Sequence, residues 1–216
     1  MIICLFDLDG TLVDSTKPVL AALNAALDDL DLAPVTVEDL SSIIGPPLRA
    51  TFVTLVAERG ANEDIADRLL DTYRARYRTT STELAASYPG VPELLERLHG
   101  RTRLGVVTSK PTTYAIPILD ALGFSSMMEV MEGPGLSETE AKPATLARAL
   151  DRLGVISDFD SIFMIGDRHH DIEAGRSAGV RTVGVTWGFG SRDELGDAGA
   201  EFVVDVPNEI STIALP

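Results

Sequence analysis

The pattern of hydrophobic and polar residues predicts two kinds of structure along the chain. From residue 88 onward, short apolar runs alternate with stretches whose apolar residues recur at helical spacing. Such runs are typical of buried parallel strands, and the periodic stretches are typical of amphipathic helices. This alternation predicts an α/β fold with a Rossmann-like, doubly wound parallel sheet. The expected strands cover residues 2–6, 103–108, 127–131, 161–165, 182–185 and 202–204, and the expected helices cover residues 89–98, 143–153, 172–178 and 194–198, with another helix ending at residue 122.

Residues 15–87 interrupt this alternation with a pattern that is helical. Helices are expected over residues 15–32, 48–59 and 62–78, with a short helix after Thr36. Residues 43–48 contain a glycine and two prolines, which break helices and predict a loop. We therefore expect two domains: a core formed by residues 1–14 and 88–216, and an all-helical domain formed by residues 15–87.

Composition narrows the class of protein. A chain of 216 residues with 45% hydrophobic content can bury one α/β core and a modest second domain. The apolar start is too short, and too soon broken by Asp7 and Asp9, to be a signal peptide, and no stretch reaches the length of a membrane helix. A single cysteine, Cys4, excludes an internal disulfide framework, so a cytoplasmic location is predicted. The net charge of −15 argues against nucleic-acid binding.

The end of the first predicted strand carries two carboxylates. Asp7 and Asp9 are separated by one residue, so an extended backbone directs both to the same face. Gly10 then allows a sharp turn. One carboxylate could act as a nucleophile while the other handles protons, and a divalent cation would relieve their repulsion. The alternative is a strand that ends in a polar turn without function.

Other polar groups follow later strands. Thr108 and Ser109 come after the second strand, where hydroxyls and backbone amides could bind phosphate, although a plain helix N-cap is an alternative. Lys110 and Lys142 are two of only three lysines in a chain that otherwise uses arginine, and a lysine suits a phosphate oxygen.

A further strand ends at Asp167, and Asp171 lies four residues on. Carboxylates gathered at neighbouring strand ends predict a Mg²⁺ site. His169 and His170 would suit zinc, but adjacent histidines usually point in different directions, and no cysteine partners are present. Magnesium is therefore the predicted cofactor.

Four segments resemble the ordered motifs of the haloacid dehalogenase superfamily. They cover residues 7–11, 108–110, 142–143 and 166–171, and the resemblance extends over nearly the whole chain. The helical insert resembles the cap domain of the subclass that includes phosphoglycolate phosphatases, and residues 184–191 are similar to the tail of that group.

The resemblance implies a Mg²⁺-dependent phosphatase that hydrolyses a small phosphomonoester through an aspartyl-phosphate intermediate. Phosphoglycolate is the first candidate substrate. It implies that Asp7 attacks phosphorus and that Asp9 is the general acid and base. Gly10 would allow close backbone approach at a phosphate site that also contains Thr108, Ser109 and Lys142. The metal site would contain Asp7, Asp9 through its backbone carbonyl, Asp167 and Asp171. Ser109 departs from the asparagine that the family often has at this position.

Several alternatives share these motifs. A sugar phosphomutase or a 5′-nucleotidase-like phosphatase would have the same four segments. A dehalogenase needs neither Asp9 nor Asp167, and a phosphonatase needs a cap lysine, for which Lys17 is the only candidate. A non-catalytic binding protein would have lost a motif carboxylate.

The expected partner is a small phosphorylated metabolite, with no nucleic acid and no membrane, and the expected state is a monomer or homodimer. In the cap loop, Gly45 shapes the turn, and Arg49 could bind a substrate carboxylate. The alternative for Arg49 is a position on the solvent face of the following helix.

Overall fold

The computed structural model describes residues 1–136, 140–155 and 161–215. Contacts between residues divide the chain into two compact units, one formed by Met1–Asp14 and Ala86–Pro216 and the other by Ser15–Ala85. The second junction therefore lies two residues before the predicted boundary at residue 87. Asp14 N donates a hydrogen bond of 2.9 Å to Ala86 O, and Val13 bridges to Ser87, so these backbone contacts join residues 86 and 87 to the larger unit.

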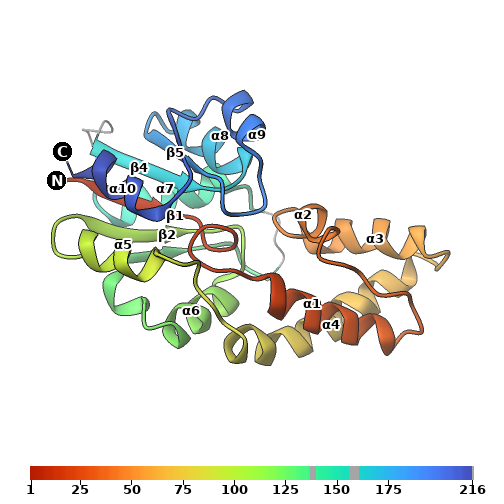
Figure 1. The fold of residues 1–216 in the computed structure, drawn as a ribbon. Helices are drawn as coiled ribbons and strands as arrows, with labels where there is room; N and C mark the ends of the chain where they lie inside the picture. Colours follow the sequence, from red (N-terminus) through yellow and green to blue (C-terminus); the bar gives the residue numbers. More distant parts are fainter. Residues whose placement is uncertain (137–139, 156–160, 216) are drawn as a thin grey trace. The chain divides into compact units, whose positions relative to one another are not determined.

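The described part of the larger unit contains a six-stranded sheet in the order β3-β2-β1-β4-β5-β6 (Figure 1). Every neighbouring pair is parallel, which confirms the predicted Rossmann-like α/β class. Strand β1 lies in the middle, with β2 on one side and β4 on the other. In open α/β sheets the crevice at such a reversal of strand order is where ligands bind. The strands are β1 (Ile3–Phe6), β2 (Arg103–Val107), β3 (Val130–Glu132), β4 (Ile162–Gly166), β5 (Arg181–Val185) and β6 (Phe202–Val204).

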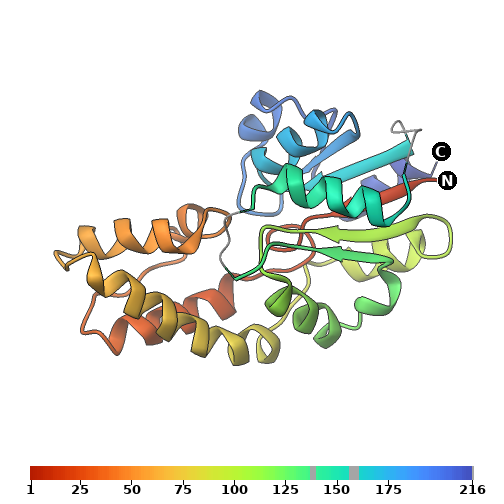
Figure 2. The same ribbon diagram turned by 180° about the vertical axis from the view of Figure 1, so that it is seen from behind.

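Helices cover both faces of the sheet. Helices α5 and α10 lie in front of the strands in Figure 1, whereas α7 lies in front of them in Figure 2. Alternate β1 residues Ile3 and Leu5 join the core under α7 and α8, as do Ile162 and Met164 of β4. The helices of this unit are α5 (Val91–Leu98), α6 (Thr112–Ala121), α7 (Lys142–Arg152), α8 (His169–Ser177), α9 (Arg192–Asp197) and α10 (Pro207–Ala214), with a 3₁₀ turn, η1, at Ser125–Met127.

Helices α8 and α10 each contain a first turn that the sequence analysis did not predict. Helix α8 begins three residues before the expected residue 172, because the Asp171 carboxylate accepts a hydrogen bond from Arg168 N at 3.0 Å and so caps the helix. Helix α10 was not expected. Pro207 opens it, and the Glu209 carboxylate accepts from Val206 N at 3.2 Å. In both cases a carboxylate in the first turn binds backbone N–H groups, which a search for apolar periodicity does not detect.

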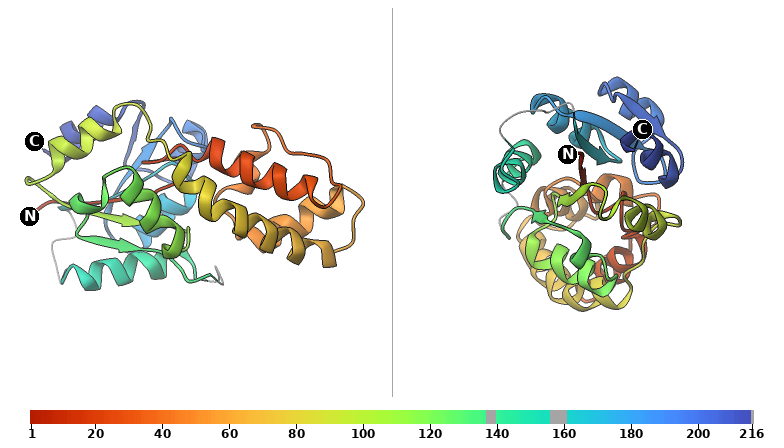
Figure 3. Two further views of the ribbon diagram at one scale, coloured as in Figure 1. Left: turned by 90° about the horizontal axis from the view of Figure 1, so that it is seen from below. Right: turned by 90° about the vertical axis from the view of Figure 1, so that its left-hand side faces the viewer.

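The smaller unit is a helical bundle. It contains α1 (Thr16–Asp28), α2 (Leu40–Ile43), α3 (Leu48–Glu58) and α4 (Asp64–Glu83). Figure 3 shows α1 (red) alongside α4 (gold), and α3 also packs against α4. Phe52, Tyr73 and Tyr77 form an aromatic cluster in its core, with Phe52 edge-on to Tyr73 at a centroid distance of 5.4 Å. Helix α4 extends five residues beyond the expected end at residue 78.

None of the helices that the structure describes combines the length and apolar character that a bilayer crossing requires.

Truncating Leu5 to alanine should destabilise the fold. Its side chain is fully buried in the central strand, so Leu5→Ala removes apolar burial and leaves a cavity, at a cost of about 2–5 kcal/mol in the free energy of unfolding. Urea denaturation followed by circular dichroism measures the change. Val206→Ala is the control, because Val206 is 52% exposed and its loss should cost no more than about 0.5 kcal/mol. Equal losses in the two variants would contradict the position of Leu5 in the core.

Candidate active site

The carboxyl ends of the central strands bring three carboxylates together. Asp7 follows β1 and extends the ladder, since its N–H donates to Ile165 O of β4 at 2.8 Å. Asp167 follows β4, and Asp171 lies in the first turn of α8. One oxygen from each of the three side chains lies within 4.8 Å of the others, and all three residues are buried. The structure therefore brings together three of the carboxylates that the sequence analysis selected.

Lys142 is the cation that faces this cluster. It is the first residue of α7, and its Nζ lies 2.6 Å from Asp7 Oδ1 and also donates to Asp171. Asp7 continues the alternation of Ile3 and Leu5 toward the face that α7 covers, which explains why these two side chains meet. A single lysine cannot neutralise three buried carboxylates, so the cluster keeps an excess of negative charge.

Burial and that excess of negative charge raise the pKa values of two of the carboxyl groups. Burial, together with the nearby Asp171 and Asp9 charges, raises the pKa of Asp7 to about 7, even though Lys142 acts in the opposite direction. Burial and the charges of Asp171 and Asp7 also raise the pKa of Asp167 well above its ordinary value. Burial alone would lower the pKa of Lys142, but Asp171 and Asp7 outweigh it and raise that pKa, so the lysine stays charged.

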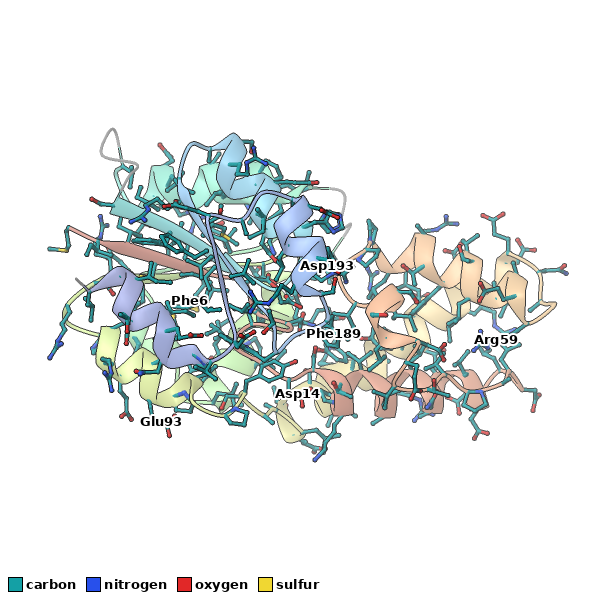
Figure 4. The ribbon with its side chains drawn as sticks, turned by 45° about the horizontal axis from the view of Figure 1, so that its top comes forward. Phe6, Asp14, Arg59, Glu93, Phe189 and Asp193 are labelled. Carbon is teal, nitrogen blue, oxygen red and sulfur yellow. The ribbon has the colours of Figure 1, made fainter. Side chains whose placement is uncertain are left out.

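One backbone N–H and one side-chain hydroxyl hold Asp167 in place. Its Oδ2 accepts a hydrogen bond of 2.7 Å from Phe189 N, and the Thr11 hydroxyl lies 3.4 Å from its Oδ1. Phe189 belongs to the loop between β5 and α9 (Figure 4). Gly10 has a φ of 85°, and a Cβ at that position would overlap the Asp167 carboxylate. Gly10 is thus required both for its left-handed backbone and for the close approach of this side chain.

The Phe189 loop was not among the predicted site residues. Its signal in the sequence is the pair of glycines that flank Phe189: a Cβ at Gly188 or Gly190 would overlap Asp167. Glycine spacing indicates a close approach of backbone, but it does not say which group approaches.

Asp9 lies apart from the acidic cluster and has its own cation. Its Oδ2 lies 3.0 Å from Lys110 Nζ, and both side chains are largely buried. Its other oxygen, Oδ1, is buried and accepts no hydrogen bond from the residues that the structure describes. The two motif aspartates are therefore distinct, since Asp7 faces Lys142 and Asp9 faces Lys110. The sequence analysis noted Lys110 for its rarity but did not include it among the site residues.

Thr108 and Ser109 precede helix α6 and do not cap it. The helix starts at Thr112 after Pro111, whereas the Thr108 Oγ1 accepts a hydrogen bond of 3.0 Å from Lys110 N. Thr108 is buried, and its N–H donates to Glu132 O at 2.9 Å. Ser109 is half-buried. The N-cap alternative for this segment is wrong, because the turn after β2 is longer than a direct strand-to-helix connection.

Gly45 and Arg49 belong to the helical unit. Gly45 lies between α2 and α3 with a φ of 108°. Arg49 binds Asp67 of α4 through two bonds, Nε to Oδ1 at 2.8 Å and Nη2 to Oδ2 at 3.2 Å, and more than half of both side chains is exposed. This pairing favours the interpretation that Arg49 lies on the solvent face of its helix. Its role in substrate binding stays a prediction.

The paired histidines do not diverge as expected. The ring centroids of His169 and His170 lie 3.7 Å apart, with the planes tilted by 49°. Both residues lie in the first turn of α8, and His169 is held by Glu194 of α9 through a contact of 2.7 Å.

The donor set of the acidic cluster fits a hard divalent cation. Carboxylate oxygens are the ligands that Mg²⁺ prefers, and the three buried carboxylates exceed the charge of the lysine that faces them. The residues that could hold the ion are Asp7, Asp167 and Asp171.

Comparison with known proteins assigns the chain to a protein family. Residues 4–185 match the family described as haloacid dehalogenase-like hydrolase, so the chain belongs to that family. This confirms the resemblance drawn from the four motifs.

Relatives and solved structures agree with this assignment. The chain is 37% identical to a 5′-nucleotidase of Pseudomonas aeruginosa, over 88% of this chain and 85% of the relative. It is 34% identical to a phosphoglycolate phosphatase of Rhodospirillum rubrum, over 93% and 86% of the two chains. A crystal structure of a predicted phosphatase from Clostridium acetobutylicum is 30% identical, covers 99% of this chain and 98% of its own, and has a TM-score of 0.86.

Replacing Asp167 with asparagine tests whether the buried carboxylates hold a cation. Because Asp167 resists ionisation in its burial among like charges, Asp167→Asn should raise the melting temperature of the metal-free protein at neutral pH. For the unmodified protein, Mg²⁺ at about 100 times its Kd should add about 2.7 kcal/mol to the free energy of unfolding. Each kcal/mol should raise the melting temperature by about 2–4 °C. The variant should lose most of this increase. Thermal melting in EDTA and in excess MgCl₂ measures both effects.

The same melts at lower pH supply the control. The folded state binds the Asp7 proton with a pKa of about 7, against 3.8 for an ordinary aspartate, so it holds a proton that the unfolded chain releases between these values. Stability of the metal-free protein should therefore fall as the pH rises from about 4 to about 7. Because a metal binds the ionised carboxylates, the Mg²⁺ effect should be larger near pH 8 than near pH 5. An equal Mg²⁺ effect at both pH values would contradict binding at this cluster.

Proposed function

We propose that the protein is a Mg²⁺-dependent phosphatase that hydrolyses a small phosphomonoester through an aspartyl-phosphate intermediate. The observation that carries the proposal is the Asp7 carboxylate, which is buried at the end of the central strand, paired with Lys142 and within 4.8 Å of two further carboxylates. The names of two relatives, a 5′-nucleotidase and a phosphoglycolate phosphatase, support hydrolysis of phosphate monoesters.

Asp7 is the proposed nucleophile. One of its oxygens attacks phosphorus while the bond from phosphorus to the ester oxygen breaks, and the phosphoryl group passes to the carboxylate. Lys142 Nζ lies 2.6 Å from Asp7 Oδ1, so it is placed to hold a phosphoryl oxygen against the attacking group. Its raised pKa keeps it charged at neutral pH, as this role requires.

The proposed metal site consists of Asp7, Asp167, Asp171 and the backbone carbonyl of Asp9. When bound, Mg²⁺ supplies positive charge that lets a carboxylate approach a phosphate dianion. The contacts of Asp167 with Phe189 N and the Thr11 hydroxyl fix the orientation of that ligand before any ion arrives.

Asp9 is the proposed general acid and base. It gives a proton to the departing alkoxide in the first step and takes one from water in the second, when water attacks phosphorus and the bond between phosphorus and the Asp7 oxygen breaks. Asp9 Oδ1 is buried and has no partner among the described residues, so it is the oxygen that can exchange this proton. Lys110 holds the other oxygen and fixes the orientation of the carboxyl group.

The remaining phosphate contacts are proposed for the turns after β1 and β2. Gly10 lets the backbone come close to the phosphoryl group, and the hydroxyls of Thr108 and Ser109 supply further donors. Thr108 is fixed by its bonds to Glu132 O and Lys110 N, which makes it the better ordered of the two.

The proposed substrate is a small phosphorylated metabolite, and phosphoglycolate is the first candidate. A 5′-nucleotidase-like activity is the second candidate, because the relative with that name is 37% identical over 193 residues. A sugar phosphomutase stays open and differs in forming an isomer without releasing phosphate. The role of residues 15–87 as a cap, and of Gly45 and Arg49 within it, remains part of the proposal. Assays of phosphate release from phosphoglycolate, nucleoside monophosphates and sugar phosphates separate these candidates.

Asp7→Asn should abolish phosphatase activity, because an amide cannot attack phosphorus. We expect turnover of p-nitrophenyl phosphate in the presence of Mg²⁺ to fall by about 10³-fold or more. The control is Asp151→Asn, which changes an exposed carboxylate of α7 in the same unit and should leave the rate unchanged. Retention of the full rate by Asp7→Asn would refute the proposed nucleophile.

Asp9→Asn should affect poor leaving groups far more than good ones. p-Nitrophenolate departs without a proton, whereas a simple alkoxide needs one, and general acid help is worth about 10²–10⁴-fold. Formation of the phospho-enzyme should thus slow strongly with an alkyl phosphate and little with p-nitrophenyl phosphate. Hydrolysis of the phospho-enzyme should slow with both substrates, because Asp9 also activates the water in this step. Rapid mixing of the variant with p-nitrophenyl phosphate should therefore show a burst of p-nitrophenol. The same loss of phosphorylation rate for both substrates would exclude Asp9 as the acid.

A further inference from the structure

A second group of metal-ligating side chains lies on helix α8, outside the acidic cluster. His169, His170 and Glu173 each offer a ligand atom, and these atoms lie within 4.8 Å of one another. His169 and Glu173 are four residues apart, so they share one face of the helix, and the near approach of the two imidazole rings brings His170 to the same place. This approach was not expected from the sequence, where adjacent histidines usually diverge.

A carboxylate from another helix orients the first of these histidines. Glu194 Oε1 of α9 lies 2.7 Å from His169 Nδ1. The same oxygen accepts hydrogen bonds from His169 N at 3.0 Å and from Arg168 Nε at 2.9 Å, so it acts as an acceptor. The ring nitrogen that faces it must therefore carry the hydrogen, which leaves the lone pair on Nε2. Histidines that bind metals commonly donate their second ring nitrogen to a carboxylate in this way.

Exposure distinguishes this group from the acidic cluster. His170 and Glu173 are exposed and His169 is partly exposed, whereas Asp7, Asp167 and Asp171 are all buried. Asp171 lies between the histidines and Glu173 in the chain, but its side chain faces inward, where it accepts from Lys142 Nζ and Arg168 N. The acidic cluster is therefore buried, the second group lies toward the surface of α8, and the two groups share no ligand.

We propose that His169, His170 and Glu173 bind a divalent transition-metal ion, of the class of Zn²⁺, Co²⁺ or Ni²⁺, at a site separate from the acidic cluster. Two imidazoles and one carboxylate suit these ions, whereas Mg²⁺ prefers oxygen ligands alone. Water completes the coordination sphere, because the ligands lie at the surface. Glu194 is a positioning residue, since it acts through His169.

Cobalt provides a direct test, because the visible absorption bands of Co²⁺ change when protein ligands replace its coordinated water, without any measurement of activity. Untagged protein is saturated with Mg²⁺ to fill the acidic cluster and is then titrated with Co²⁺. We expect one equivalent of Co²⁺ to produce visible absorption bands that Zn²⁺ abolishes by competition. His170→Ala and Glu173→Gln should each weaken Co²⁺ binding by at least about 10-fold, and Glu194→Gln should weaken it by about 10–100-fold through loss of the contact with His169.

Two controls keep the result specific. His99→Ala removes the third histidine of the chain, which lies outside this group, and should leave Co²⁺ binding unchanged. Asp7→Asn alters the acidic cluster and the proposed phosphatase, and it should also leave the Co²⁺ spectrum intact. A failure of the proposed phosphatase function is therefore distinguishable from a failure of this site. The proposal is overturned if His170→Ala and Glu173→Gln bind Co²⁺ as the unmodified protein does, or if Asp7→Asn removes the signal.

Discussion

The structure of the candidate site depends on Lys142, the buried cation that joins Asp7 of the central strand to Asp171 of α8. A buried carboxylate is tolerated only when it is paired or neutralised, and Lys142 supplies that charge for two of the three acids. One lysine does not supply enough positive charge for all three acids, and the pKa values of Asp7 and Asp167 are raised by burial and also for this reason. The fold thus maintains a concentration of negative charge that a divalent cation would relieve.

Close packing of backbone segments holds Asp167 within this group of negative charges. Gly10, Gly188 and Gly190 all lie against Asp167, and a side chain at any of them would overlap that residue. The turn after β1 and the loop after β5 therefore both approach the end of β4. The second aspartate of the first motif, Asp9, is directed to Lys110 instead, so two carboxylates separated by one residue occupy different electrostatic surroundings. Different surroundings are what the proposed division of roles requires, with Asp7 as the nucleophile and Asp9 as the acid and base.

Much of the fold could be predicted from local patterns. The strands of the sheet are short, continuous apolar runs, and the helix α7 shows strong amphipathic spacing, so both were found within a few residues of their observed bounds. The first turn of α8 and the whole of α10 were missed because Asp171 and Glu209 stabilise the starts of these helices by accepting backbone hydrogen bonds, and such polar contacts leave no apolar period. The second domain boundary shifted because backbone bonds from residues 13 and 14 reach residues 86 and 87.

The sequence by itself determined the parallel α/β class, the family and the identity of the acidic residues, because strand periodicity and motif spacing are local properties of the chain. Only the tertiary structure decided which cation each aspartate faces, that Phe189 N binds Asp167, and that Glu194 orients His169 beside His170. These contacts join residues on separate elements, and their geometry depends on how strands and helices pack. No pattern within a single segment contains that information.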